Sequence, residues 1–125
     1  MGYSSIASLL LMLAVGLGAF GAHGLKSRLD AYSLGIWEKA VFYHFIHALG
    51  VLIVTVMPRV GMLTEQWSTR VSLLLILGIV LFSGSLYLFA LSGVTILGAV
   101  TPLGGVAFIA GWLVLTIQLA RGNRK

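Results

Sequence analysis

No charged side chain occurs between Arg70 and Arg121, and this gap constrains the fold more than any other feature of the sequence. An average soluble domain carries about 25% charged residues, which it needs to cover its surface. Only 9% of the residues are charged here, whereas 59% are hydrophobic. The apolar surface must therefore face lipid, and the sequence predicts an integral membrane protein.

An α-helix needs about 20 mostly apolar residues to cross the hydrocarbon layer of a bilayer. Four segments meet this requirement, at about residues 3–22, 37–57, 71–92 and 102–120. Residues 1–125 are thus predicted to form a single transmembrane domain of the all-α class with four spans. The first span lacks the basic start of a signal peptide, and we interpret it as permanent.

Proline and capping residues predict where the spans begin and end. Pro58 ends the second span, because proline cannot continue a helix. Thr101 is expected as an N-cap with Pro102 at the first helical position, so that residues 93–100 form a short apolar link.

Residues 24–36 alternate polar and apolar side chains at helical spacing. This pattern predicts a short amphipathic interfacial helix between the first and second spans, with an ordinary polar loop as the alternative.

Basic residues beside the spans predict the orientation of the chain, because cytoplasmic loops are enriched in Lys and Arg. The side that holds both chain ends carries five basic residues, and the opposite side carries three. The first group is Arg59, Arg70, Arg121, Arg124 and Lys125, and the second is Lys26, Arg28 and Lys39. We therefore expect both termini in the cytoplasm.

Four motifs occur in an order that matches a known family. They are Gly18–Leu25; Trp37 with Ala40, Tyr43 and His47–Leu49; Leu81–Tyr87; and Thr101–Phe108 with Gly111 and Trp112. On these motifs the chain resembles domain-of-unknown-function family 423, the YgdD-like small bacterial inner-membrane proteins, which are similar to eukaryotic transmembrane protein 256. The resemblance covers nearly the whole chain. It implies a multipass four-helix fold in a bacterial cytoplasmic (inner) membrane, and it supplies no activity.

Polar side chains inside a membrane need partners, because an unsatisfied polar group in hydrocarbon is costly. At about 1.5 Å of rise per residue, several of them fall at one depth in the outer half of the bundle. We predict that they line a pocket for a lipid, a small hydrophobic molecule or a partner membrane protein. The set is His23, Glu38, Tyr43, His44, His47, Ser83, Ser85, Tyr87 and Thr101.

His44 and His47 are three residues apart and therefore share one helix face. Two such imidazoles are compatible with a haem or metal site, for which His23 or Glu38 would be needed. Glu38, however, lies well around the helix from that face. The alternative, in which both histidines form hydrogen bonds across the bundle, is the usual arrangement in membranes. We expect no metal and no cofactor.

Small residues recur at spacings that allow helices to approach closely. They are Ala14, Gly18 and Ala22 in the first span, Gly78 with Ser85 and Ser92 in the third, and Ala107 and Gly111 in the fourth. We expect them to pack helices within the chain, with an oligomer interface or a lipid-tail groove as the alternative. Gly104 and Gly105, just after the expected helix start, are also compatible with an anion site.

The sequence contains no catalytic constellation, phosphate loop or dinucleotide motif, and it has no cysteine. We therefore expect a non-enzymatic accessory protein. Its expected partners are membrane lipids and either a second copy or another membrane protein, but not nucleic acid. A small oligomeric channel or carrier that relays protons, and a haem- or metal-binding redox protein, are the two alternatives.

Overall fold

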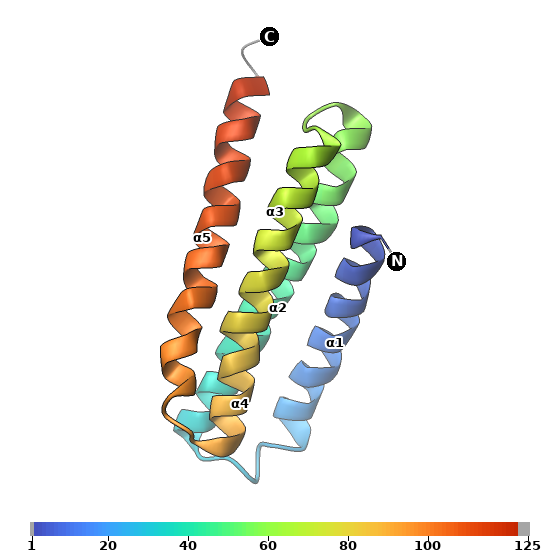
Figure 1. Ribbon diagram of the computed structural model, residues 1–125. Coiled ribbons are helices and arrows are strands. Elements are labelled where there is room, and N and C mark those ends of the chain that lie inside the picture. Colours follow the sequence, from blue (N-terminus) through green and yellow to red (C-terminus); the bar gives the residue numbers. More distant parts are fainter. Residues whose placement is uncertain (1, 123–125) are drawn as a thin grey trace.

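The first half of the chain forms two antiparallel helices joined by a loop (Figure 1). The computed structural model describes residues 2–122. Helix α1 comprises Tyr3–His23, and α2 comprises Ala31–Val56. A short 3₁₀ turn, η1, continues α2 over Met57–Val60 and contains Pro58, which marks the end of the regular α-helix as predicted.

The second half forms two more antiparallel helices. The third span runs continuously through α3 (Glu65–Gly78), a π-helical turn η2 (Ile79–Ser83) and α4 (Gly84–Ser92). The fourth is α5, Leu97–Gly122. Four helices within residues 2–122 are long and apolar enough to cross a membrane, which confirms the predicted number of spans.

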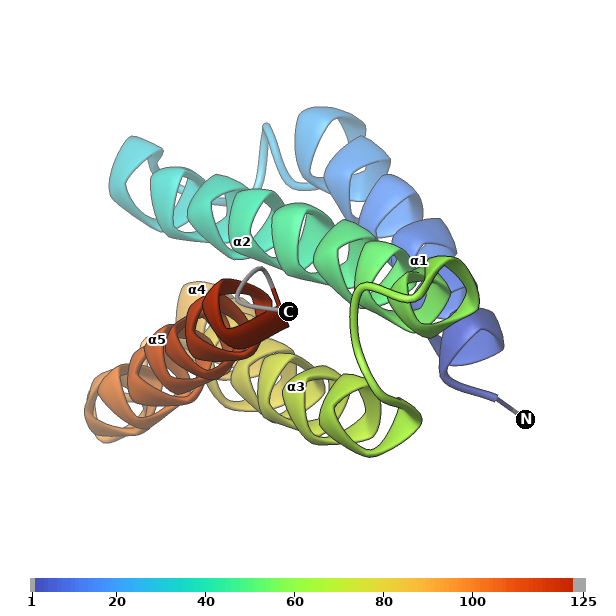
Figure 2. The ribbon, with the colours of Figure 1, turned by 90° about the horizontal axis from the view of Figure 1, so that it is seen from above.

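Helix α2 lies at the centre of the bundle (Figure 2). It packs against α1 on one side and against α3, η2 and α4 on the other. Helix α5 packs mainly against α3, η2 and α4, whereas α1 makes its main contacts with α2. Helix α1 is therefore the peripheral element, and its attachment depends on a single helix interface.

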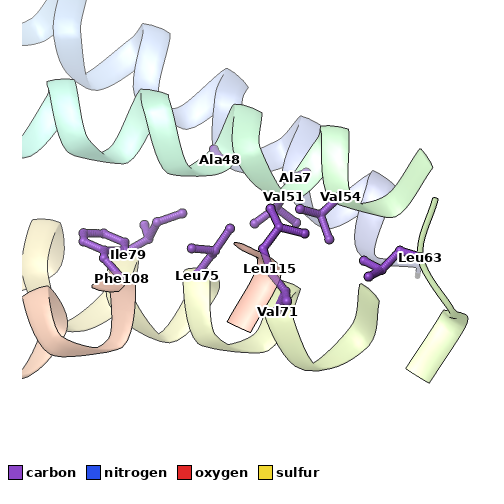
Figure 3. Close-up of a cluster of buried hydrophobic side chains, with 10 residues drawn as sticks. All are labelled: Ala7, Ala48, Val51, Val54, Leu63, Val71, Leu75, Ile79, Phe108 and Leu115. Carbon is purple, nitrogen blue, oxygen red and sulfur yellow. The ribbon is translucent and has the colours of Figure 1, made fainter. Parts of the chain in front are cut away.

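A cluster of buried apolar side chains joins all four spans (Figure 3). Two glycines allow the helices to come this close. A Cβ atom on Gly78 would lie 2.3 Å from Cδ1 of Phe108, and one on Gly111 would lie 2.8 Å from Cδ2 of Leu75. The cluster consists of Ala7, Ala48, Val51, Val54, Leu63, Val71, Leu75, Ile79, Phe108 and Leu115.

The predicted amphipathic interfacial helix is wrong, and the alternative of a loop is correct. Residues 24–29 form turns, and residues 31–36 belong to α2. Asp30 is the N-cap of α2, because its carboxylate accepts a hydrogen bond of 2.7 Å from the backbone N–H of Ser33, which also holds the pKa of Asp30 below its usual range. Leu25 is buried with Trp37 and Ala90, so the loop folds over the end of the bundle instead of lying on the lipid surface.

The predicted N-cap at Thr101 is also wrong, because α5 begins at Leu97. The chain enters α5 through successive tight turns, in which the backbone N–H of Leu97 donates to the carbonyl of Val94 and that of Gly98 donates to Thr95. Pro102 consequently lies inside the helix. Because proline has no N–H, the bond that residue 102 would otherwise donate to the carbonyl of Gly98 is missing.

Candidate functional site

His44 and Tyr87 form a hydrogen-bonded pair between α2 and α4. Nδ1 of His44 lies 2.8 Å from the Tyr87 hydroxyl, and only 3% of the His44 surface is exposed. Nε2 of His44 is buried and has no hydrogen-bond partner within residues 2–122. The ring of Trp37 packs on Tyr87 with centroids 4.7 Å apart, and its indole N–H donates to the carbonyl of Leu17 at 2.9 Å. This aromatic and polar contact links α1, α2 and α4.

The π-helical turn brings the serines of the third span against two other helices. The backbone N–H of Gly84 donates to the carbonyl of Ile79, five residues earlier, so one residue is inserted into the regular helix. Ser83 is fully buried and its hydroxyl donates to the carbonyl of Ala40 at 2.8 Å. Ser85 donates to the carbonyl of Phe82 at 3.0 Å. The Ser85 hydroxyl thus gives a hydrogen-bond partner to a carbonyl of the π-helical turn, where the regular α-helical bonds are interrupted.

Ser85 also meets Thr101, and their hydroxyl oxygens lie 2.6 Å apart. The Thr101 side chain therefore joins α5 to α4 instead of capping a helix. Together with the contacts of His44 and Ser83, this bond shows that much of the predicted polar set is used for packing within the chain. Such buried interhelical bonds are worth about 0.6–2 kcal/mol each in membrane proteins.

His47 lies among aromatic rings. Its ring stacks on Phe108 with centroids 3.5 Å apart and an interplanar angle of 13°, and Nδ1 lies 2.8 Å from the carbonyl of Tyr43 in its own helix. Tyr43 and Trp112 contact the other parts of the ring, at centroid distances of 6.0 Å and 5.7 Å. His47 therefore lies one turn away from the His44–Tyr87 pair, in a separate environment.

His23 and Glu38 do not join these contacts, because both are exposed. Among the residues that the structure describes, no group of three His, Asp or Glu side chains is close enough to hold a metal ion. The suggested anion site at Gly104 and Gly105 is wrong, because the helix start lies earlier. A Cβ on Gly104 would lie 2.3 Å from the backbone nitrogen of Phe82, so this glycine serves close packing of α5 on η2.

A cavity of about 180 Å³ lies between the end of α1 and the first half of α2. Small residues of α1 form one wall, and α2 supplies an indole ring and a carboxylate. The lining residues are Gly18, Gly21, Ala22, Trp37, Glu38 and Val41. Gly18 and Ala22 belong to the small-residue ridge predicted from sequence, and Glu38 belongs to the predicted polar set. The sequence did not indicate Gly21 and Val41 as lining residues, because their role depends on the contact between two helices.

A second hollow region lies at the opposite end of the bundle and was not predicted. One cavity of about 260 Å³ is formed by the loop of residues 61–64 with Trp67, Gln118, Arg121 and Gly122. An apolar groove of about 460 Å³ runs along the end of α2 and η1 and shares Met62 with that cavity. The arginines near this end indicated orientation in the sequence, but they do not reveal that loop and helices enclose a space.

Comparison with known proteins identifies relatives along almost the full chain. Residues 17–105 match the family described as "Protein of unknown function (DUF423)". UPF0382 membrane protein SH2409 of Staphylococcus haemolyticus is 48% identical over 113 residues, which cover 90% of each chain. UPF0382 membrane protein SERP0230 of Staphylococcus epidermidis is 52% identical over 106 residues, 85% of this chain and 84% of the relative.

A relative from Bacillus subtilis, UPF0382 membrane protein YwdK, is 44% identical over 115 residues, 88% of this chain and 89% of the relative. No solved structure matches the chain. The relatives carry the description of membrane proteins, in agreement with the four apolar helices. The chain therefore belongs to the DUF423 family of membrane proteins of unknown function.

Proposed function

We propose that this protein is a non-enzymatic accessory protein of the bacterial cytoplasmic membrane that holds an amphiphile with a cationic amine head group between α1 and α2. The cavity at Glu38 carries this proposal. It lies where α1 ends and the loop to α2 begins, which is the depth of a lipid head group for a helix that spans the bilayer. The deeper polar residues support it less, because they bond to one another.

The chemistry of the cavity wall favours a cation with an apolar body. Glu38 supplies a carboxylate, and no basic side chain is among the residues that line the cavity. Trp37 is only 3% exposed and its ring packs on Phe20 and Tyr87, so it adds an apolar part to the wall, and the carboxylate alone supplies the attraction for a cation. Gly18 and Gly21 let Val41 and Trp37 of α2 pack close to α1. Exposed Ala22 leaves room beside the cavity for the apolar part of the ligand.

Replacing Glu38 by glutamine is expected to weaken binding of an aminophospholipid about two- to fivefold, because the exposed ion pair is lost while shape is kept. Ala22→Leu is expected to weaken binding too, since the larger side chain fills the groove from an exposed position. Native mass spectrometry of the full chain with phosphatidylethanolamine, phosphatidylcholine and phosphatidylglycerol measures both effects.

Glu65→Gln is the matched control, because Glu65 is an exposed carboxylate at the start of α3 near the other end of the bundle. It should leave binding of phosphatidylethanolamine unchanged. Equal affinity for the three lipids, or equal binding by wild type and Glu38→Gln, would disprove the proposed head-group selectivity.

We also propose that both termini face the cytoplasm. Arg59 of η1, Arg70 near the start of α3 and Arg121 in the last turn of α5 lie at one end of the bundle, whereas Lys26 and Arg28 lie in the loop between α1 and α2 at the opposite end. The chain has no cysteine, so single cysteines report accessibility without background. A membrane-impermeant maleimide should label Ser27→Cys in intact cells and label Gln66→Cys only after permeabilisation. The reverse labelling pattern would show that both termini face away from the cytoplasm.

A further inference from the structure

The end of the bundle that holds η1 contains three adjoining hollows around one residue, Met62. The polar cavity of about 260 Å³ and the apolar groove of about 460 Å³ both use Met62 as a wall. A third space of about 280 Å³ lies beside them, between residues 61–62 and the end of α5. A polar and an apolar space thus share Met62 in the turn between the second and third spans.

The position of Met62 is fixed by the way η1 ends. Gly61 adopts a left-handed conformation with φ of 75°, and its backbone N–H donates to the carbonyl of Pro58. The backbone N–H of Met62 donates to the carbonyl of Met57 at 3.0 Å. These two bonds form a Schellman motif, which turns the chain back over the bundle. The wall between the hollows is therefore part of a defined helix end.

The polar cavity has a positive environment. Arg121 from the last turn of α5 lines it together with Gln118 and Trp67. The guanidinium of Arg70 lies 4.6 Å from the ring centroid of Trp67, so a second positive charge is held next to the cavity. The carboxylate near this end is Glu65, which does not line the cavity. An anion is therefore the expected occupant of the polar part.

The apolar groove determines what kind of anion fits. Its lining includes Leu52, Ile53, Val56 and Val60, and no charged residue contributes to it. A small soluble anion would leave this groove unused, whereas a phospholipid places its phosphate beside the arginine and an acyl chain in the groove. Half-buried Trp67 is also the residue type found where head groups begin.

We propose that the η1 end of the bundle is a binding site for an anionic phospholipid. The phosphate binds in the cavity beside Arg121, Gln118 and Trp67, and one acyl chain lies along α2 and η1, with Met62 between the two parts. This site is separate from the cavity at Glu38 and does not depend on it. It gives the protein a contact with the leaflet opposite to that of the amine-binding site.

Binding of phosphatidylglycerol to the full chain in detergent, measured by native mass spectrometry, tests the site. Arg121→Gln is expected to weaken binding about fivefold, the effect of removing one basic residue near a lipid phosphate. Val56→Trp should weaken it as well, because Val56 is 46% exposed and the larger ring occupies the groove without entering the core. Melting temperatures in detergent establish that both variants remain folded.

Arg28→Gln, at the opposite end, is the control for general surface charge and should change the affinity less than twofold. Phosphatidylcholine should bind more weakly than phosphatidylglycerol, and inorganic phosphate alone should not saturate the site. The proposal is overturned if Arg28→Gln and Arg121→Gln have equal effects, if phosphate alone saturates the cavity, or if Val56→Trp retains full affinity for phosphatidylglycerol.

Discussion

Gly104→Ala is expected to destabilise the bundle by about 3 kcal/mol, near the upper end of the cost of overpacking. The added Cβ would lie 2.3 Å from the backbone nitrogen and 2.7 Å from the Cα of Phe82. These atoms belong to η2, so no side-chain rotation relieves the clash. Helix α5 must move away from η2, which also strains the hydroxyl contact between Ser85 and Thr101.

Gly105→Ala is the matched control, because the two substitutions add the same atom at neighbouring positions of the same helix. The nearest atom to a Cβ on Gly105 is Cδ2 of Phe82, at 3.9 Å, which is an ordinary contact. Alanine also favours a helix more than glycine does. Thermal unfolding in detergent should therefore show a large loss for Gly104→Ala and little change for Gly105→Ala. Equal melting temperatures for the two variants would contradict the observed α5–η2 approach.

Trp37→Ala is expected to cost about 3–5 kcal/mol and to loosen α1 from the rest of the bundle. Trp37 is 3% exposed and it packs between Phe20 of α1 and Tyr87 of α4. Its indole N–H donates to the carbonyl of Leu17. Because α1 makes its main contacts with α2, the loss of this side chain falls on the interface that attaches α1.

Trp37→Phe keeps an aromatic ring, although a smaller one, and removes the hydrogen-bond donor. It should cost more than roughly 1 kcal/mol, the usual net value of one hydrogen bond, and less than Trp37→Ala, because part of the ring packing is kept. Hydrogen exchange of α1 amides, measured beside global unfolding, shows where the loss occurs. Faster exchange confined to α1 in Trp37→Ala supports the peripheral role of this helix, whereas uniform acceleration through all spans would contradict it.

The two proposed lipid sites lie at opposite ends of the bundle. The carboxylate of Glu38 and the guanidinium of Arg121 lie in cavities at opposite ends of the bundle, and their charges favour opposite head groups. Between them the polar side chains of α2 and α4 pair within the chain, as His44 does with Tyr87. The lipid-binding variants can therefore be tested independently of each other and of the core.

The helix boundaries show how far local sequence rules extend. The number of spans followed directly from hydrophobic length, because any segment in lipid must satisfy its own backbone groups. Pro58 correctly marked the end of α2. Thr101 followed by Pro102 was misleading, since the tight turns from Val94 start α5 earlier and the Thr101 hydroxyl bonds to Ser85. A capping residue cannot be distinguished from an interhelical donor by sequence alone.

The polar residues also show which features can be predicted from sequence and which cannot. Their depth along the helices was predictable from the rise per residue, and His44 does meet Tyr87. Their partners were not predictable, because the π-helical turn at η2 rotates the following residues relative to a regular helix and thereby decides which neighbours Ser83 and Ser85 meet. Nothing in the residue types of Ile79–Ser83 signals this inserted residue.

The amino-acid sequence by itself determined that the chain crosses the membrane four times, since apolar length and the absence of charge are local properties. The tertiary structure alone decided which polar groups bond to one another between helices and which line a cavity. A cavity exists only where side chains from different helices fail to fill the gap between them. The hollows at Glu38 and at Arg121 therefore arise from how the helices approach each other, and no single helix contains the information for either.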